Sequence, residues 1–180
     1  MFGQRMVKSG ILALLAVSLL SLPAESEVPQ DQETKLTKAE RLEAEANDIL
    51  RNGDMDEWLD AADLLVESAH LRPESYFPAA RNLQFAAAIF AWSGSDEKAR
   101  VLFEEAAQRA VANGELVFAA NTYLDCAFVS AKLRMGRHTI AAAQAAQKLA
   151  KSREVGYRDR ERIMARLTLL DAPTRLGDVM

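Results

Sequence analysis

Residues 77–114 read FPAARNLQFAAAIFAWSGSDEKARVLFEEAAQRAVANG, and this stretch decides the fold class of the chain. Apolar residues recur every three or four positions in both halves, which is the spacing of one helical face. Gly94 separates the halves, and Asn113-Gly114 closes the second half as a helix C-terminus commonly does. The stretch therefore predicts two amphipathic helices joined by a tight turn.

The same pattern occurs before and after this hairpin. Leu42, Leu83 and Leu124 stand 41 residues apart, and each opens a helical pattern. The patterns stop at glycines: Gly53, Gly94 and Gly136. Three hairpins over residues 38–155 and a seventh helix at 157–171 follow from this repeat, and no stretch alternates with the period of a β-strand. Stacked helical pairs usually bind another macromolecule rather than perform chemistry.

The first 24 residues, MFGQRMVKSGILALLAVSLLSLPA, are excluded from the predicted fold. Arg5 and Lys8 precede an apolar run over residues 10–22, and Leu22-Pro23-Ala24 approximates a cleavage site, which is typical of an export signal. The alternative is an uncleaved anchor, but the run is shorter than the roughly 20 residues that span a bilayer. We therefore expect a cleaved signal and an exported protein, periplasmic or secreted.

The rest of the chain divides into three parts. Residues 25–37 are polar and acidic and predict a flexible leader, residues 38–171 form the helical domain, and residues 172–180 form a tail. The formal charge of the whole chain is −4, and loss of Arg5 and Lys8 makes residues 25–180 more acidic, at −6. Cys126 is the single cysteine, so no internal disulfide can form.

The central hairpin resembles a tetratricopeptide repeat. The positions that keep the signature spacing of that family are Leu83, Ala86, Ala87, Phe90, Gly94, Ala99, Phe103 and Ala106. The third hairpin is similar at Leu124, Ala127, Phe128 and Ala131, and the first hairpin matches less well. The resemblance implies an all-α, right-handed superhelical array of three hairpins with a capping helix. The 41-residue period exceeds the usual 34 and approaches that of HEAT-type repeats, and an ordinary bundle of six or seven helices is the alternative.

In such an array the first helices line a concave face that holds the partner. The resemblance places twelve residues on it: Glu40, Glu43, Asn47, Arg51, Arg81, Gln84, Ala88, Trp92, Thr122, Asp125, Val129 and Leu133. The expected partner contacts are Arg81, Gln84, Ala88, Trp92, Glu43, Asn47 and Asp125. Trp92 is either an exposed binding anchor or packed on the next hairpin, and Trp58 is expected in the core.

Charge is distributed unevenly along the chain. Residues 25–131 hold 9 basic and 21 acidic groups, whereas residues 132–175 hold 11 basic and 4 acidic groups. One interpretation is a basic surface for an anionic membrane or polymer, formed by Arg158, Arg160, Arg162 and Arg166. The other is a solvated capping helix whose charges offset one another. Nucleic acid is not expected as a partner, because the chain is acidic and lacks interleaved basic and aromatic residues.

The sequence contains no recognisable catalytic, metal-binding or cofactor-binding motif. His70 and His138 have no metal-ligand spacing, and no nucleophile elbow, phosphate-binding glycine loop or dinucleotide fingerprint occurs. Cys126 and His138 could pair as thiol and imidazole, but they lack a third partner, so we expect a buried structural thiol. The sequence thus predicts an exported, non-catalytic module or scaffold that binds another protein in its concave face. The alternative is an envelope-associated subunit that docks through the basic surface.

Overall fold

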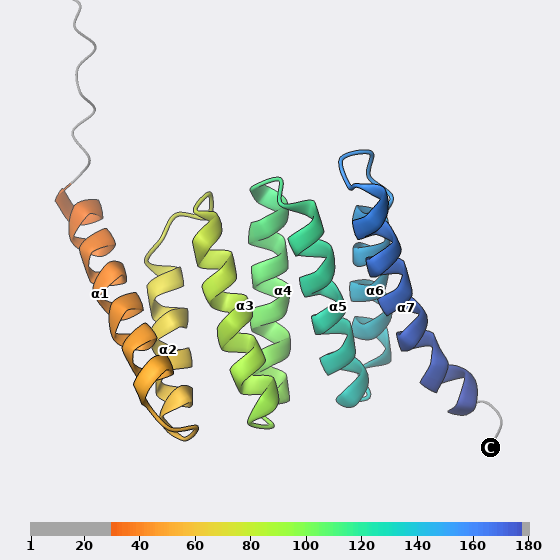
Figure 1. Ribbon diagram of the computed structural model, residues 1–180, viewed down its shortest axis with the longest axis horizontal. Coiled ribbons are helices and arrows are strands. Elements are labelled where there is room, and N and C mark those ends of the chain that lie inside the picture. Colours follow the sequence, from red (N-terminus) through yellow and green to blue (C-terminus); the bar gives the residue numbers. More distant parts are fainter. Residues whose placement is uncertain (1–29, 178–180) are drawn as a thin grey trace, which may run out of the picture.

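The chain folds as a row of helices in a computed structural model, which describes residues 30–177 and the side chains of residues 34–170. Each helix packs against its neighbours in chain order, and α1, α3, α5 and α7 lie in front of α2, α4 and α6 (Figure 1). The helices are α1 Gln30–Asn52, α2 Glu57–His70, α3 Phe77–Trp92, α4 Asp96–Ala112, α5 Leu116–Lys132, α6 Gly136–Ala150 and α7 Tyr157–Gly177. The prediction of an all-α chain with three successive hairpins and a seventh helix is confirmed at this level.

The first and last helices are longer than the sequence indicated. α1 begins at Gln30 rather than at Lys38, so residues 30–37 of the expected leader are helical. These residues include glutamine, glutamate and lysine, which form helices well. α7 continues past Asp171 to Gly177, so residues 172–177 of the expected tail are helical. The predicted signal at residues 1–24 lies outside the described residues.

The turns between helices use left-handed backbone conformations at equivalent places. Gly94 follows α3 with a φ of 88°, and Gly114 follows α4 with a φ of 75°. After α5 the equivalent residue is Arg134, with a φ of 58°, and Gly136 is already the first residue of α6. The expectation that Gly136 is the turn residue is therefore wrong. A glycine two positions too late cannot relieve the strain, since the left-handed residue directly follows the helix C-cap.

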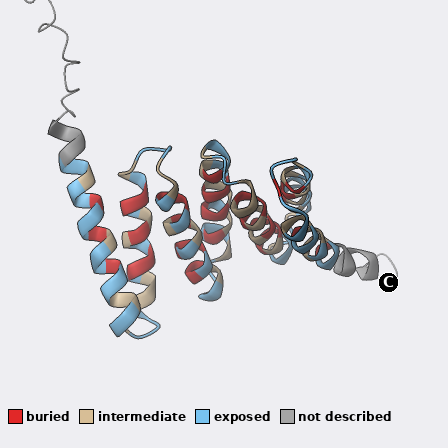
Figure 2. Cartoon of the chain, turned by 45° about the horizontal axis from the view of Figure 1, so that its top comes forward, coloured by how far each residue is buried: buried red, intermediate tan, exposed pale blue. Residues whose placement is uncertain are grey.

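Small side chains form most of the core. More than half of the buried apolar residues among those described are alanines, and Leu83, Leu124 and Ile163 are the largest fully buried side chains. Buried residues of α1 to α5 lie on faces turned toward neighbouring helices (Figure 2). Ala87, from the best-matched hairpin, is completely buried. Close packing of alanine faces lets the helices approach one another, which explains why the described array needs few large side chains.

Candidate functional site

The α3 helix carries an exposed stripe on the side opposite its core face. Arg81, Phe85, Ala88 and Trp92 follow one another at intervals of four, three and four residues, which places them on one face of the helix. Phe85 is 51% exposed and Trp92 is 60% exposed, and Arg81 and Ala88 are exposed as well. We call these four residues the α3 stripe. It puts two large aromatic side chains in water, two helical turns apart.

The two tryptophans differ in their exposure to solvent. Trp92 is 60% exposed, so most of its side chain is accessible to solvent. Trp58, at the start of α2, is partly buried and packs against the main core, as expected. Phe85 was missed in the sequence, although its spacing from Arg81 and Ala88 is the signal that identifies it. The core pattern of α3 already predicts an outward position for residue 85.

Arg81, at the N-terminal end of the α3 stripe, makes a contact with an aromatic ring outside the stripe. Its guanidinium carbon lies 5.4 Å from the centre of the Phe77 ring, one turn toward the start of α3. That ring in turn meets Phe118 of α5 edge-on, with centroids 5.2 Å apart. Arg81 makes no ion pair within the described residues. Its charge is therefore available to a carboxylate on a partner.

The neighbouring face of α1 is polar. Asn47, Glu40 and Arg51 are exposed as the resemblance implied. Glu43 is partly buried and accepts a hydrogen bond from Arg72 over 3.3 Å. α1 thus carries polar groups at the repeat positions that correspond to Arg81, Ala88 and Trp92 of the α3 stripe, but no aromatic anchor.

The α5 residues expected on the same face are largely covered. Thr122 is completely buried and donates its hydroxyl to the Phe118 carbonyl over 2.9 Å, while Val129 is only 8% exposed. Leu133 is partly buried. Placing Thr122 and Val129 on an open face was therefore wrong, since both side chains are buried among the neighbours of α5. Within the described residues, the open part of the face lies over α1 and α3.

Polar side chains link the first-layer helices from α3 to α7. The Gln84 amide donates to the Asp125 carboxylate over 3.4 Å, and Arg166 donates to the other oxygen of Asp125 over 2.6 Å. Arg166 also donates to the side-chain oxygen of Asn121 over 2.9 Å. Gln84 and Asp125 are thus partly buried partners of one another rather than free contacts, and each would have to exchange a bond to meet a ligand.

Of the four arginines predicted to form the basic surface, two are exposed and two are bound to other groups of the protein. Arg158 and Arg162 are exposed, and the side chain of Arg162 is 80% accessible. Arg160 instead donates to the carbonyls of Ala150, Ser152 and Val155, at 2.9, 3.0 and 3.2 Å. Arg166 is engaged by Asp125. Arg160 and Arg166 therefore do not belong to the exposed surface: an arginine that satisfies helix-end carbonyls or a partly buried carboxylate faces inward.

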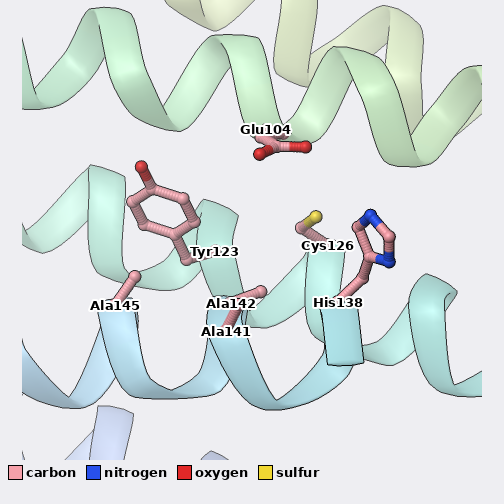
Figure 3. Close-up of a pocket in the computed structure, with 7 residues that line it drawn as sticks. All are labelled: Glu104, Tyr123, Cys126, His138, Ala141, Ala142 and Ala145. Atoms are coloured by element: carbon pink, nitrogen blue, oxygen red, sulfur yellow. The ribbon is translucent and has the colours of Figure 1, made fainter. Parts of the chain in front are cut away.

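A pocket of about 210 Å³ lies between α4, α5 and α6. Its lining residues are Glu104, Tyr123, Cys126, His138, Ala141, Ala142 and Ala145 (Figure 3). The Cys126 thiol and the His138 ring lie next to each other there, on different helices (Figure 3). Burial, with a further contribution from the Glu104 carboxylate, raises the pKa of Cys126 to about 11. The thiol therefore stays protonated at neutral pH and is a poor nucleophile.

Two further properties of the described residues bear on the kind of site. They contain no group of three or more histidine, cysteine, aspartate or glutamate side chains placed to hold a metal ion. None of their helices is both long enough and apolar enough to span a bilayer.

The comparisons with known proteins identify no family for this chain, and its architecture is described by the helices alone. No protein-family model matches the chain, and the search of curated proteins finds no match. The seven described helices form an all-helical array in which neighbours pack tightly, an arrangement compatible with a helical repeat.

Proposed function

We propose that this protein is an exported, non-catalytic interaction module of the tetratricopeptide-like type, which binds a segment of another envelope or secreted protein over α1 and α3. The observation that carries the proposal is the α3 stripe, with Phe85 and Trp92 in water two turns apart. The 41-residue repeat and the successive hairpins support a right-handed superhelix with first helices on the binding side. The sequence of residues 1–24 supports export.

The stripe has an energetic reason to be covered. An aromatic side chain offers 150–250 Å² of surface in all, so a partner that covers about 100 Å² of each ring contributes about 2.5 kcal/mol per ring. Tryptophan and arginine are also the residue types most often found at the energetic centre of protein interfaces. Here Trp92 and Arg81 lie at opposite ends of one stripe.

The chemistry of the stripe describes its partner. Phe85, Ala88 and Trp92 form an apolar strip, and Arg81 places one positive charge at its end. A matching segment carries apolar side chains over about two helical turns and a carboxylate at one end, which suits either an amphipathic helix or an extended peptide. The polar side chains of Asn47 and Glu40 on α1 then supply hydrogen bonds at the edge.

Site-specific photocrosslinking in the cells that express the protein tests this proposal. A photoreactive residue replaces Ala88 in the stripe, and a matched control replaces Gln108, which is exposed on α4 in the other layer. We expect one protein to be trapped from position 88 and not from position 108. Its direct affinity for the purified protein should fall at least tenfold with Phe85→Ala and Trp92→Ala combined, since truncation of central aromatic residues commonly costs about 2 kcal/mol or more.

A second pair of variants tests whether the loss of affinity is specific to the α3 stripe or follows from removal of any exposed apolar side chains. Val101 and Val111 of α4 are exposed at 47% and 39%, and their combined replacement by alanine should leave the affinity unchanged. Equal crosslinking from both positions, or equal loss of affinity in both pairs of variants, contradicts the proposal. Fractionation of the cells tests export independently, because an exported protein is recovered outside the cytoplasm with a shortened N-terminus.

A further inference from the structure

The charge of the chain is distributed unevenly along the row of helices. Because each helix packs on its neighbours in chain order, α1 and α2 form one end and α6 and α7 the other (Figure 1). Residues 30–70 hold 12 acidic and 4 basic groups, whereas residues 116–177 hold 5 acidic and 11 basic groups. The middle, residues 71–115, is nearly balanced with 6 acidic and 5 basic groups. The molecule therefore has an acidic end and a basic end.

Ion pairs neutralise the middle of the array. Lys98 of α4 meets Asp63 of α2 at 2.5 Å, and Lys132 at the end of α5 meets Asp96 of α4 at 2.7 Å. Arg100 pairs with Glu97 at 2.8 Å within α4. The first two contacts join different helices and the third lies within α4, so part of the charge in the middle of the row is already compensated.

Several carboxylates of the acidic end are not compensated in this way. Glu45 and Asp48 of α1 and Asp60 of α2 are exposed and form no ion pair within the described residues. Asp48 accepts a hydrogen bond from the Asn52 amide, which is neutral. Arg41 and Arg51 of α1 also form no ion pair within the described residues, and they reduce the charge of this end without cancelling it.

In the later repeats, the positions equivalent to Glu45 and Asp48 are occupied by uncharged residues. One period after Glu45 and Asp48 stand Ala86 and Ile89 of α3, and one further period on stand Ala127 and Ser130 of α5. All four of these later residues are buried in the array. The α1 face that corresponds to a packed seam in the later repeats is thus open to solvent, and it is acidic.

The basic end has the opposite character. Lys151 and Arg153 in the connection after α6, and Arg158 on α7, are exposed and form no ion pair within the described part of the chain. Arg162 has only a distant contact with Asp159, at 3.9 Å. Leu169 and Tyr157 of α7 are 63% and 70% exposed beside these charges.

We propose that a second copy of this chain is the partner of both ends: the basic end of one molecule, at Lys151, Arg153, Arg158 and Arg162, docks on the acidic end of the next, at Glu45, Asp48 and Asp60. The two surfaces differ, so the contact is heterologous and each molecule keeps one free end of each kind. Such a contact builds linear or closed head-to-tail assemblies. Each added molecule presents another α3 stripe, although the assembly does not depend on what that stripe binds.

The ionic strength sets the strength of this contact. Exposed charges act over about 30 Å at 0.01 M salt and over only about 3 Å at 1 M salt. Sedimentation velocity of the purified protein over a range of concentrations should therefore show association at about 0.01 M salt that weakens at least tenfold at about 1 M salt. A protein that stays monomeric at every concentration and at both ionic strengths overturns the proposal.

Charge reversal at each end gives the decisive measurement. Glu45→Lys with Asp48→Lys removes the negative charge of the docking surface at Glu45, Asp48 and Asp60, and Lys151→Glu with Arg158→Glu removes the net positive charge of the docking surface at Lys151, Arg153, Arg158 and Arg162. Each double variant alone should lose self-association, whereas an equimolar mixture of the two should form one-to-one pairs, because the unaltered basic surface of the first variant meets the unaltered acidic surface of the second. A control with the same change in charge, Glu74→Lys with Glu115→Lys, alters exposed residues between the ends and should associate like the original chain.

The outcomes of the mixing experiment are distinct. Circular dichroism first establishes that every variant is folded, which the exposure of all six positions leads us to expect. A mixture that stays monomeric, or single-end variants that associate normally, overturns the proposal. So does a monomeric original chain that binds vesicles containing about 30% anionic lipid and loses this binding on reversal of Lys151 and Arg158, because the basic end is then a membrane-docking surface.

Discussion

Arg166 on α7 and Asp125 on α5 form an ion pair at 2.6 Å, which fastens the last helix of the row to the front layer. Both side chains are partly shielded from solvent, with accessibilities of 35% and 28%. Arg166 also reaches the ring of Phe128, whose centre lies 5.8 Å from the guanidinium carbon. The pair therefore combines a charge-assisted hydrogen bond with a packing contact.

Replacement of Arg166 by alanine should lower the free energy of unfolding by about 1.5–3 kcal/mol, because a charged hydrogen bond is lost and Asp125 keeps only its weaker bond from Gln84. Urea unfolding measures this change, and hydrogen exchange should show α7 opening more readily. Arg162→Ala is the matched control on the same helix, since that side chain is 80% exposed, and it should change stability by less than about 0.5 kcal/mol. Equal effects of the two changes would contradict this role for Arg166.

Arg160 should be more sensitive than its neighbour Arg158. Its guanidinium satisfies three carbonyls at the end of α6 and in the connection that follows. Arg160→Ala leaves those acceptors to water and should cost about 1–3 kcal/mol of stability, whereas Arg158→Ala should be nearly neutral. Arg160→Lys should recover only part of the loss, because an ammonium group cannot reach three acceptors with the geometry of a guanidinium. Thermal unfolding of the three variants tests this order.

The turn after α5 can be stabilised by a single substitution. A left-handed conformation costs a non-glycine residue roughly 1–2 kcal/mol, and Arg134 adopts it with a φ of 58°. Glycine removes that strain but gains freedom in the unfolded chain worth about 0.5–1 kcal/mol. Arg134→Gly should therefore raise stability by about 0.5–1 kcal/mol. Gly94→Ala imposes the reverse change at a φ of 88°, with no steric clash, and should lower stability by about 1 kcal/mol.

Alkaline pH should weaken the fold through Cys126. Burial raises the pKa of its thiol from an ordinary value of 9.0 to about 11, so the folded state favours the protonated form. The contribution to stability is complete below pH 9.0 and declines as pH rises through about 11, with an upper limit of about 3 kcal/mol. Urea unfolding from pH 8 to 11 should show this decline, and Cys126→Ala should reduce it. Burial also raises the pKa of Tyr123, and Tyr123→Phe separates the two contributions.

The cysteine can also be followed by its reactivity. A protonated, buried thiol should react with iodoacetamide far more slowly in the folded protein than in urea at the same pH. Rapid alkylation of the folded protein at neutral pH that slows with His138→Ala would show that His138 activates the thiol, and the pocket between α4, α5 and α6 would then be a reactive site.

The sequence by itself determined the helices and their core faces. Apolar spacing identified Leu83, Ala87 and Leu124 as interior residues, and all three are completely buried. This information is local, because the 3.6-residue period fixes which side chains share one face of a helix whatever surrounds it. Helix ends were less well determined at α1 and α7, where good helix formers extend the pattern beyond its apolar part.

Only the tertiary structure decided which outward faces remain open. Phe85, Ala88 and Trp92 of α3 have counterparts one period later in Cys126, Val129 and Leu133 of α5, and both sets are apolar. The α3 set is exposed, whereas Cys126 and Val129 are buried and Leu133 is partly buried. For Cys126 the physical reason is the packing of α5 against α4 and α6, because its thiol donates to the Arg100 carbonyl of α4 over 3.6 Å and lines the pocket that α4 and α6 complete. A periodic sequence specifies the faces of each helix, but the neighbours that cover them depend on contacts between residues far apart in the chain.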